Sequence, residues 1–316
     1  MIVVGGLGRG GDVGGGLVIG LHLMRLGVKP IVASFLRCKT GSIVNGENIT
    51  EALVRVTPRS YSSGRFFEPH VSGLGFETYV LCVEERKEDV VKGIEWLVRK
   101  RRVRVWFATD LGGDSLVKGD EPLVGSYKTD MRALAALSEA IEKYGLKGFL
   151  AVGVLGLEGG GKELSQAHLA NHVMELYMDG AYRGYYVPPK NLVSSIMNML
   201  SYLLGRQRSA MLTLYRDTLG GFVGRRRYDV VYLHDIVEIK PWHKVLFIFD
   251  AGMTCERSIF CRKAREGWSH GLRRAARNRK IKRLKKGEAP KLDSVVEILM
   301  RRPFHLERIV KELIPT

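Results

Sequence analysis

The sequence predicts an α/β fold with a doubly wound, mostly parallel sheet and a basic helical C-terminal extension, and three observations lead to this prediction. Short, nearly continuous apolar segments alternate with helix-like segments over the first two-thirds of the chain. A glycine-rich stretch joins the first apolar segment to the first helix-like segment, and Lys and Arg crowd a helix-like segment near the end. Uninterrupted apolar runs of this kind are typical of parallel strands buried under helices on both faces.

The expected elements follow in chain order from apolar runs and from apolar residues at helical spacing. Strands are expected at residues 1–4, 30–36, 77–82, 103–109 and 147–155. Helices are expected at 13–26, 87–101 and 162–178, and another helix is expected to begin at Asp130, which would cap it. Helices then dominate 188–219, and strands return at 228–239 and 245–250. Because the strict alternation is lost there, an open Rossmann-like sheet is favoured over a closed barrel.

The length and composition suit a folded protein in two parts. The chain has 316 residues, 45% of them hydrophobic, so a sizeable core is expected. We expect a Rossmann-like α/β domain over 1–255 and the basic extension over 256–316. No run reaches the roughly 18 apolar residues of a membrane span, and no basic leader precedes the first strand, so a cytoplasmic location is expected. Two Gln residues and 26% charged residues fit a heat-adapted protein.

The four cysteines form no CxxC pair, which argues against a zinc ribbon. Buried thiols are the main expectation. A Cys255–Cys261 disulfide is the alternative if the source is a hyperthermophile.

The glycine-rich loop, residues 5–16, predicts a site for a phosphate-bearing small molecule. Glycine lets a ligand approach the backbone, and the first turn of the following helix offers unpaired N–H groups and a positive dipole end. The spacing of Gly6, Gly8 and Gly11 fits a dinucleotide loop between a strand and a helix. The expected ligand-binding residues of this loop are Gly6, Gly8, Arg9, Gly10, Gly11 and Asp12. The alternative is a tight turn for close helix–sheet packing without a ligand.

Two features argue against an ordinary NAD site. The second strand carries no acid at its tip to hold a ribose hydroxyl; Ser34, Arg37 and Lys39 stand there instead and would suit a phosphorylated ribose or another phosphate. Asp12 would repel a phosphate directly above the helix, so it caps the helix or holds a ligand hydroxyl or a metal. A nucleotide or dinucleotide and Mg²⁺ therefore remain open as cofactors.

An acidic loop follows the fourth strand, and ligands of open parallel sheets bind outside the carboxyl ends of strands. Asp110, Asp114 and Asp120 are the expected catalytic residues, with Asp110 and Asp114 as ligands for Mg²⁺ or one carboxylate as a general base. The alternative for each is an ordinary turn or solvated acid. A third glycine-rich loop, 156–163, places Lys162 to reach a phosphate and Glu158 or Glu163 to act on a hydroxyl.

The segment from Arg262 to Lys286 holds twelve Lys or Arg residues and one acid, within a chain of net charge +17. Its cations would neutralise phosphates of RNA, and Arg273, Arg274, Arg277 and Lys280 are the expected contacts. The alternative is a solvated or partner-bound tail.

Two of these loops carry a family resemblance. The chain is similar to an uncharacterised, mainly archaeal family of unknown function, in a GGGGDVVG-type start at residues 8–15 and a DLGGDSLxxGDEP-like loop at 110–122. The resemblance runs over most of 1–255, departs at Arg9 and in the basic tail, and implies an architecture and a shared site but no reaction.

Two functions follow as hypotheses. The first is an enzyme that binds a nucleotide or phosphorylated metabolite at the glycine-rich loop, with Mg²⁺. The second is an RNA-binding protein that uses the basic segment.

Overall fold

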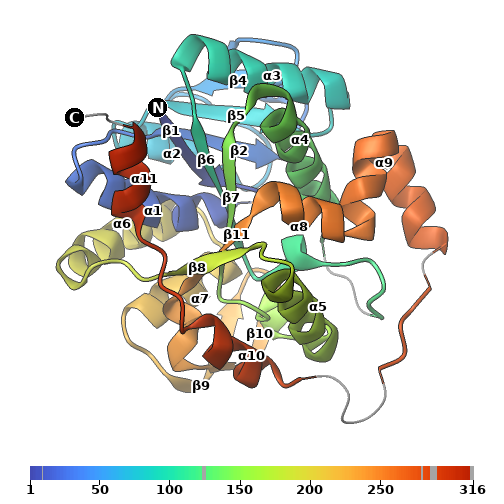
Figure 1. Ribbon diagram of the computed structural model, residues 1–316. Coiled ribbons are helices and arrows are strands. Elements are labelled where there is room, and N and C mark those ends of the chain that lie inside the picture. The colour runs from blue at the N-terminus through green and yellow to red at the C-terminus, as the bar shows by residue number, and fades with distance from the viewer. Residues whose placement is uncertain (9, 123–125, 279, 285–289, 314–316) are drawn as a thin grey trace.

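The computed structural model describes residues 1–8, 10–122, 126–278, 280–284 and 290–313. Its strands form a nine-stranded sheet in the order β3-β4-β5-β2-β1-β6-β7-β11-β8 and a separate hairpin of β9 and β10 (Figure 1). The strands of the large sheet are β1 (Ile2–Gly6), β2 (Ile31–Leu36), β3 (Glu47–Asn48), β4 (Leu53–Val56), β5 (Thr78–Cys82), β6 (Val105–Leu111), β7 (Lys147–Gly153), β8 (Tyr182–Tyr186) and β11 (Leu246–Asp250). The hairpin pairs β9 (Gly224–Val230) with β10 (Leu233–Ile239).

The centre of the sheet is parallel and its edges are antiparallel. The five strands β5-β2-β1-β6-β7 run in one direction. At one edge β4 lies antiparallel to both β5 and β3, and at the other edge β11 lies antiparallel to both β7 and β8. The expected α/β class with a large, mostly parallel sheet is therefore confirmed.

Helices pack against both faces of this sheet (Figure 1). Their bounds are α1 (Asp12–Arg25), α2 (Glu68–Gly73), α3 (Lys87–Arg101), α4 (Lys128–Tyr144), α5 (Gln166–Met178), α6 (Val193–Arg206), α7 (Ala210–Leu219), α8 (Ala251–Arg257), α9 (Ile259–Asn278), α10 (Leu292–Leu299) and α11 (Leu306–Leu313). Buried side chains of β1 alternate between two apolar clusters, because successive residues of a strand face opposite ways. Val3 packs with the cluster under α3, α4 and α9, and Ile2 and Val4 with the cluster under α1, α6 and α7.

The described part of the chain beyond residue 257 forms the helices α9, α10 and α11 and contributes to the main core. Phe260, Cys261 and Leu272 of α9 are buried with side chains of α4. The last part returns across the sheet edge, where Pro303 bridges Tyr185. A domain boundary at residue 255 stays a prediction. In the described parts of the chain, no helix is both long and apolar enough to cross a membrane.

Two sequence expectations are wrong in detail. The segment 228–239 is not one continuous strand, because Tyr232 adopts a positive φ of 63° at the tip of the β9–β10 hairpin. Asp130 does not cap α4, since this helix begins two residues earlier, at Lys128, with Tyr127 as its N-cap.

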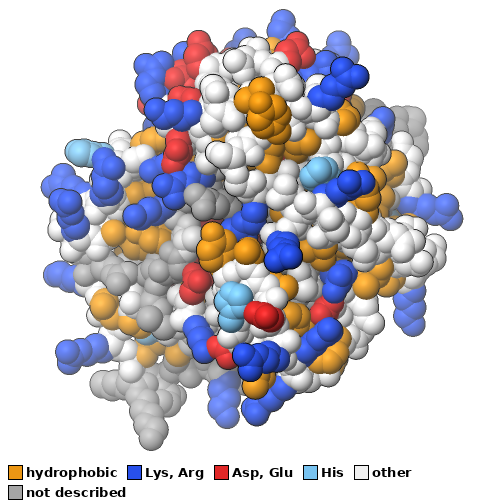
Figure 2. All heavy atoms as spheres, turned by 180° about the vertical axis from the view of Figure 1, so that it is seen from behind, with side chains coloured by type: hydrophobic (Ala, Val, Ile, Leu, Met, Phe, Trp, Pro, Cys, Tyr) orange, Lys and Arg blue, Asp and Glu red, His pale blue; other side chains and the backbone are white. Residues whose placement is uncertain are grey.

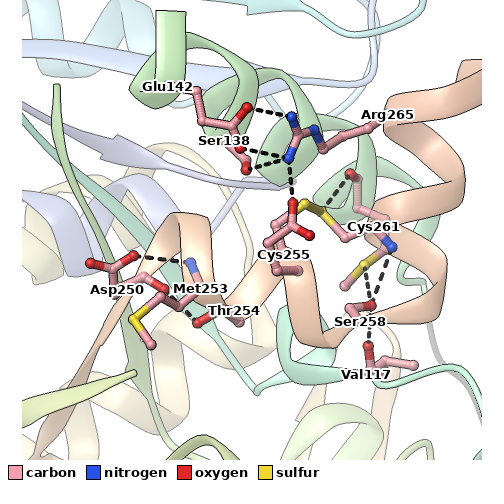
Figure 3. The surroundings of a disulfide bond; sticks show 12 residues. Val117, Ser138, Glu142, Asp250, Met253, Thr254, Cys255, Ser258, Cys261 and Arg265 are labelled. Carbon is pink, nitrogen blue, oxygen red and sulfur yellow. Dashed lines mark hydrogen bonds and ion pairs between the residues drawn. A yellow bond between two sulfur atoms is a disulfide. The ribbon is translucent and has the colours of Figure 1, made fainter. Parts of the chain in front are cut away.

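The expectation of free buried thiols is also wrong, because all four cysteines are paired in disulfides. Cys38–Cys82 joins the chain beyond β2 to the end of β5, and Cys255–Cys261 links α8 to α9. Figure 3 shows Ser258 between Cys261 and Val117, where its hydroxyl donates to the Val117 carbonyl at 2.7 Å and accepts from the Cys261 amide at 3.2 Å. The disulfide thus braces the corner at which α9 docks on the rest of the core.

Candidate functional site

Three glycine-bearing loops meet at the carboxyl ends of β1, β6 and β7. From β1 the chain first builds outward through β2 and β5, then returns to add β6 and β7 on the other side of β1. The loops after β1 and β6 therefore part in opposite directions and leave a crevice, the usual ligand position in open α/β sheets. A cavity of about 320 Å³ lies here, which we call the acidic cavity.

Six carboxylates and one guanidinium line the acidic cavity. Asp12 comes from the start of α1, Asp110 and Asp114 from the end of β6 and the turn after it, and Asp130 from the first turn of α4. The other charged lining residues are Glu158 and Glu163 of the β7–α5 loop, and Arg65. The four aspartates are each at most 7% exposed, so water does little to screen their mutual repulsion.

Backbone amides and hydroxyls hold three of the aspartates in place. The Leu111 amide donates to Asp12 Oδ1 at 3.0 Å, and the Ser115 amide donates to Asp110 Oδ2 at 3.0 Å. The Ser115 hydroxyl also donates to Asp110, and the Ser126 hydroxyl donates to Asp114 Oδ2 at 3.1 Å. These contacts orient the carboxylates but bring no positive charge.

Burial and mutual repulsion raise the pKa values of the cluster. Burial, followed by the charge of Asp114, raises the pKa of Asp110 to about 7. The pKa values of Asp12, Asp130 and Glu158 lie well above their usual range, mainly because of burial and then because of neighbouring carboxylates. Such a cluster takes up protons or cations near neutral pH, and shifts of this kind gather at functional sites.

The outer wall comes from segments far away in the sequence. Ser209, the N-cap of α7, accepts from the Leu212 amide at 3.3 Å and lines the cavity beside Ala210. Tyr232 lies at the rim, and the Arg65 guanidinium lies 4.9 Å from the centre of its ring. A cation over an aromatic ring is a favourable contact, and it ties the hairpin to the loop before α2.

The glycines of the first loop mainly allow close packing. A Cβ on Gly5 would lie 1.9 Å from the Ala33 carbonyl oxygen of β2, and one on Gly16 would lie 2.8 Å from the Gly5 amide. At Gly8 a Cβ would lie 2.0 Å from Asp130 Oδ1 and 3.0 Å from Asp12 Oδ2, so only glycine lets these carboxylates reach the backbone. The expected phosphate contacts of Gly6, Gly8, Gly10 and Gly11 stay a prediction, and the amide of Gly6 already donates to Ser34 Oγ at 3.3 Å.

We expect Gly5→Ala to destabilise the protein strongly, because the added methyl meets a backbone oxygen of the central sheet that cannot move aside. Overpacking of this kind costs roughly 1–3 kcal/mol or more. Urea unfolding measures the change, with Gly41→Ala as the control, since a Cβ there meets nothing within 4 Å. Equal stability of the two variants would contradict the packing role of Gly5.

The acidic cavity includes some of the expected site residues and leaves others out. Asp12, Asp110 and Asp114 line it. Asp120 does not line it, and its backbone oxygen instead accepts from the Lys282 amide at 3.0 Å. Lys162, expected to reach a phosphate, is exposed, does not line the cavity and pairs with Asp235 of the hairpin. Arg9 lies outside the described residues.

Sequence reasoning did not assign Asp130, Arg65, Ser209 and Tyr232 to the site. Asp130 is the one for which a signal existed, since an acid follows the second glycine-rich loop and opens a helix. The other three lie in segments with no local motif, and only the tertiary structure brings them to the cavity.

Metal binding here would depend on the ligand. Within the described ranges, no group of three or more His, Cys, Asp or Glu side chains is arranged to hold a metal ion. Mg²⁺ commonly takes only one or two carboxylates and completes its shell with water and substrate phosphates. The donor set of Asp110 and Asp114 fits that pattern and does not form a complete metal cage.

The four basic residues expected to contact nucleic acid lie in α9 or just after it, and all four are exposed. Arg273 lines a second cavity, whereas Arg274, Arg277 and Lys280 do not line it. Lys and Arg are scattered over the face shown in Figure 2, both along its outline and near its middle, rather than gathered in a single patch. The structure thus separates Arg273 from the other expected nucleic-acid contacts.

Comparison with known proteins places the chain in a family without assigning it an activity. No curated protein and no solved structure matches it. A family model matches residues 2–282, which include all the loops around the acidic cavity. The chain therefore belongs to the family described as Protein of unknown function (DUF1152).

Proposed function

We propose that this protein binds a phosphorylated small molecule together with a divalent cation in the acidic cavity and acts on it as an enzyme. The observation that carries the proposal is the meeting of six carboxylates and a single guanidinium in one cavity at the carboxyl edge of the sheet. Structural carboxylates are normally paired or solvated, and the four aspartates of this cavity are buried next to one another.

The charge of the cavity decides between ligand classes. A bare phosphate would meet the carboxylates of Asp12, Asp110 and Asp130 and be repelled. A phosphate that arrives with Mg²⁺ would bring the charge that the cluster lacks, and Asp110 and Asp114 are the residues available to hold the cation. On this proposal a cation accompanies the ligand. The amides of the glycine-rich loop do not hold the phosphate alone.

The topology supports a nucleotide among the candidate ligands. The parallel strands follow the order β5-β2-β1-β6-β7, which is the order of the doubly wound Rossmann-like sheet, and nucleotides bind at its point of reversal. On this proposal the core is such a sheet, and the crevice between the loops after β1 and β6 receives the ligand.

The proposed chemistry uses Asp110 and Asp114. One of the two would hold the cation, whose charge would activate the phosphate, and the other would take the proton from a water or hydroxyl that attacks the phosphorus as the bond from phosphorus to the leaving oxygen breaks. A cation nearby lowers the pKa of Asp110 from about 7, so the carboxylate is ionised at neutral pH when the site is filled. Asp120 has no role in this proposal because it lies outside the cavity.

The test is a thermal-shift screen of nucleotides and sugar phosphates with and without Mg²⁺. A compound at 100 times its Kd stabilises by about 2.7 kcal/mol, which raises the Tm by about 5 °C for a chain of this size. Wild type and Asp229→Asn, an exposed control on the hairpin, should respond, and Asp114→Asn should not. If no phosphorylated compound raises the Tm with Mg²⁺ or Mn²⁺, the proposal is wrong.

RNA binding is the second candidate function. The observation in its favour is the set of exposed cations Arg274 and Arg277 near the end of α9 and Lys280 just beyond it. Because α9 packs into the core, substitution of these side chains tests the idea better than deletion of the segment. Weaker binding of a single-stranded RNA by Arg274→Gln with Arg277→Gln than by wild type would support RNA binding, and unchanged binding would contradict it.

A further inference from the structure

A second cavity, of about 420 Å³, adjoins the acidic cavity and has the opposite charge. Ser126 and Asp130 line both cavities and form the wall between them. Four cations line the second one: Arg37 beyond β2, Lys128 and Arg132 on α4, and Arg273 on α9. We call it the basic cavity.

Only part of this positive charge is neutralised by the protein. Arg37 pairs with Glu84, Nε to Oε1, at 2.6 Å. Lys128, Arg132 and Arg273 form no ion pair with any residue in the described part of the chain. Arg273 instead makes a 3.0 Å contact with His270 Nδ1, so its guanidinium is free to hold an anion.

The guanidinium of Arg132 lies 6.0 Å from the centre of the Trp268 ring, but its hydrogen-bonding capacity is only partly used. It donates to the Val83 carbonyl at 3.3 Å, but its buried Nε has no hydrogen-bond partner among the described residues. Burial lowers its pKa, Glu84 raises it, and the like charges of Arg37 and Arg273 lower it further. Three guanidinium groups that repel one another are stabilised by an anion placed between them.

The start of α4 adds to this attraction. Lys128 and Thr129 are in the first turn of a 17-residue helix and line the basic cavity. Amide hydrogens at a helix start carry partial positive charge and favour a phosphate. Asp130, in the same turn, faces the acidic cavity as well, so one turn of helix contributes to both.

We infer that the basic cavity binds a phosphate group of the ligand whose reacting end lies in the acidic cavity. The inference rests on the proposed function, because it places one ligand across both cavities. It assigns this phosphate group to Arg132, Arg273 and Lys128 instead of the glycine-rich loop. Arginine and lysine in a recess suit a compact dianion. A nucleic-acid strand would contact the exposed cations of α9 outside the recess.

The test measures binding of inorganic pyrophosphate, without metal, by isothermal titration calorimetry. The variant is Lys128→Gln with Arg273→Gln, and the control is Arg274→Gln with Arg277→Gln, which makes the same charge change outside the recess. Losing two charge-assisted contacts should weaken the Kd at least about tenfold in the variant. The control should stay within about twofold of wild type.

Three results would overturn the inference: no pyrophosphate binding by wild type, equal weakening in both pairs, or binding of a single-stranded RNA that weakens more in the control pair and is displaced by pyrophosphate. The last result would identify an RNA surface. Asp114→Asn separates this inference from the proposed function, because it should abolish stabilisation by cation and ligand yet leave metal-free pyrophosphate binding intact. Retained pyrophosphate binding without any cation effect would overturn the proposed function alone.

Discussion

Asp110→Asn should raise the Tm of the metal-free protein at pH 8 and remove most of the stabilisation that Mn²⁺ gives to wild type. Asp110 is 2% exposed, and burial with the charge of Asp114 raises its pKa to about 7. A raised pKa in the folded state means that stability is full below the usual value near 4 and is lost as pH rises toward 7. Asparagine does not ionise, so the variant avoids that loss.

The expected gain at pH 8 is about 2 kcal/mol, less than the pKa difference alone implies, because asparagine accepts fewer of the hydrogen bonds now made to Asp110. At pH 4.5 the carboxyl is already protonated and the gain should vanish. Thermal unfolding at both pH values, with EDTA or Mn²⁺, measures this, and Asp229→Asn serves as the exposed control. A variant less stable than wild type at pH 8, or an unchanged Mn²⁺ effect, would show that Asp110 has only a structural role.

The second large effect concerns the disulfides. Removing Cys38–Cys82 with a double alanine variant should lower the free energy of unfolding by about 4 kcal/mol, and removing Cys255–Cys261 by about 2 kcal/mol. The difference follows from sequence separations of 44 and 6 residues, because a cross-link that closes a longer loop restricts the unfolded chain more. Guanidinium unfolding of both variants and wild type measures which variant loses more of the free energy of unfolding.

Reduction provides the control for the disulfide prediction. Wild type unfolded in dithiothreitol should approach the stability of a variant that lacks both bonds, and that variant should not respond to the reductant. Alkylation before and after reduction, read by mass spectrometry, counts free thiols. Four free thiols in the untreated protein, or equal stability with and without dithiothreitol, would contradict the pairing.

The sequence predicts the central elements well because their signals are local. The helix expected at 87–101 is α3 with the same bounds, and the strand expected at 30–36 is β2 within one residue. These segments have long apolar runs or a clear helical period, which packing reinforces. The short strands β3 and β4 and the edge strand β8, with exposed and glycine residues, lack such a signal, and their antiparallel pairing is fixed only by tertiary contacts.

The residues of the candidate site also differ in whether a local sequence pattern marks them. Asp110 and Asp114 follow directly from a buried strand that ends in an acidic loop, which composition and position reveal. Lys162 had an equally suggestive place in its loop, yet it pairs with Asp235, a residue that only the hairpin brings near. Arg65 and Tyr232 reach the cavity from distant segments, and no short-range pattern distinguishes them from surface residues.

The walls of the acidic cavity come from residues 12 to 233, carried by helices of both layers and by the hairpin. A ligand that bridges these walls would connect segments that otherwise open independently. Its departure would loosen both layers at once, so amide hydrogen exchange would speed up across the protein rather than in one loop. If the cavity binds a ligand as proposed, occupancy of the site and cooperativity of the whole chain would be coupled.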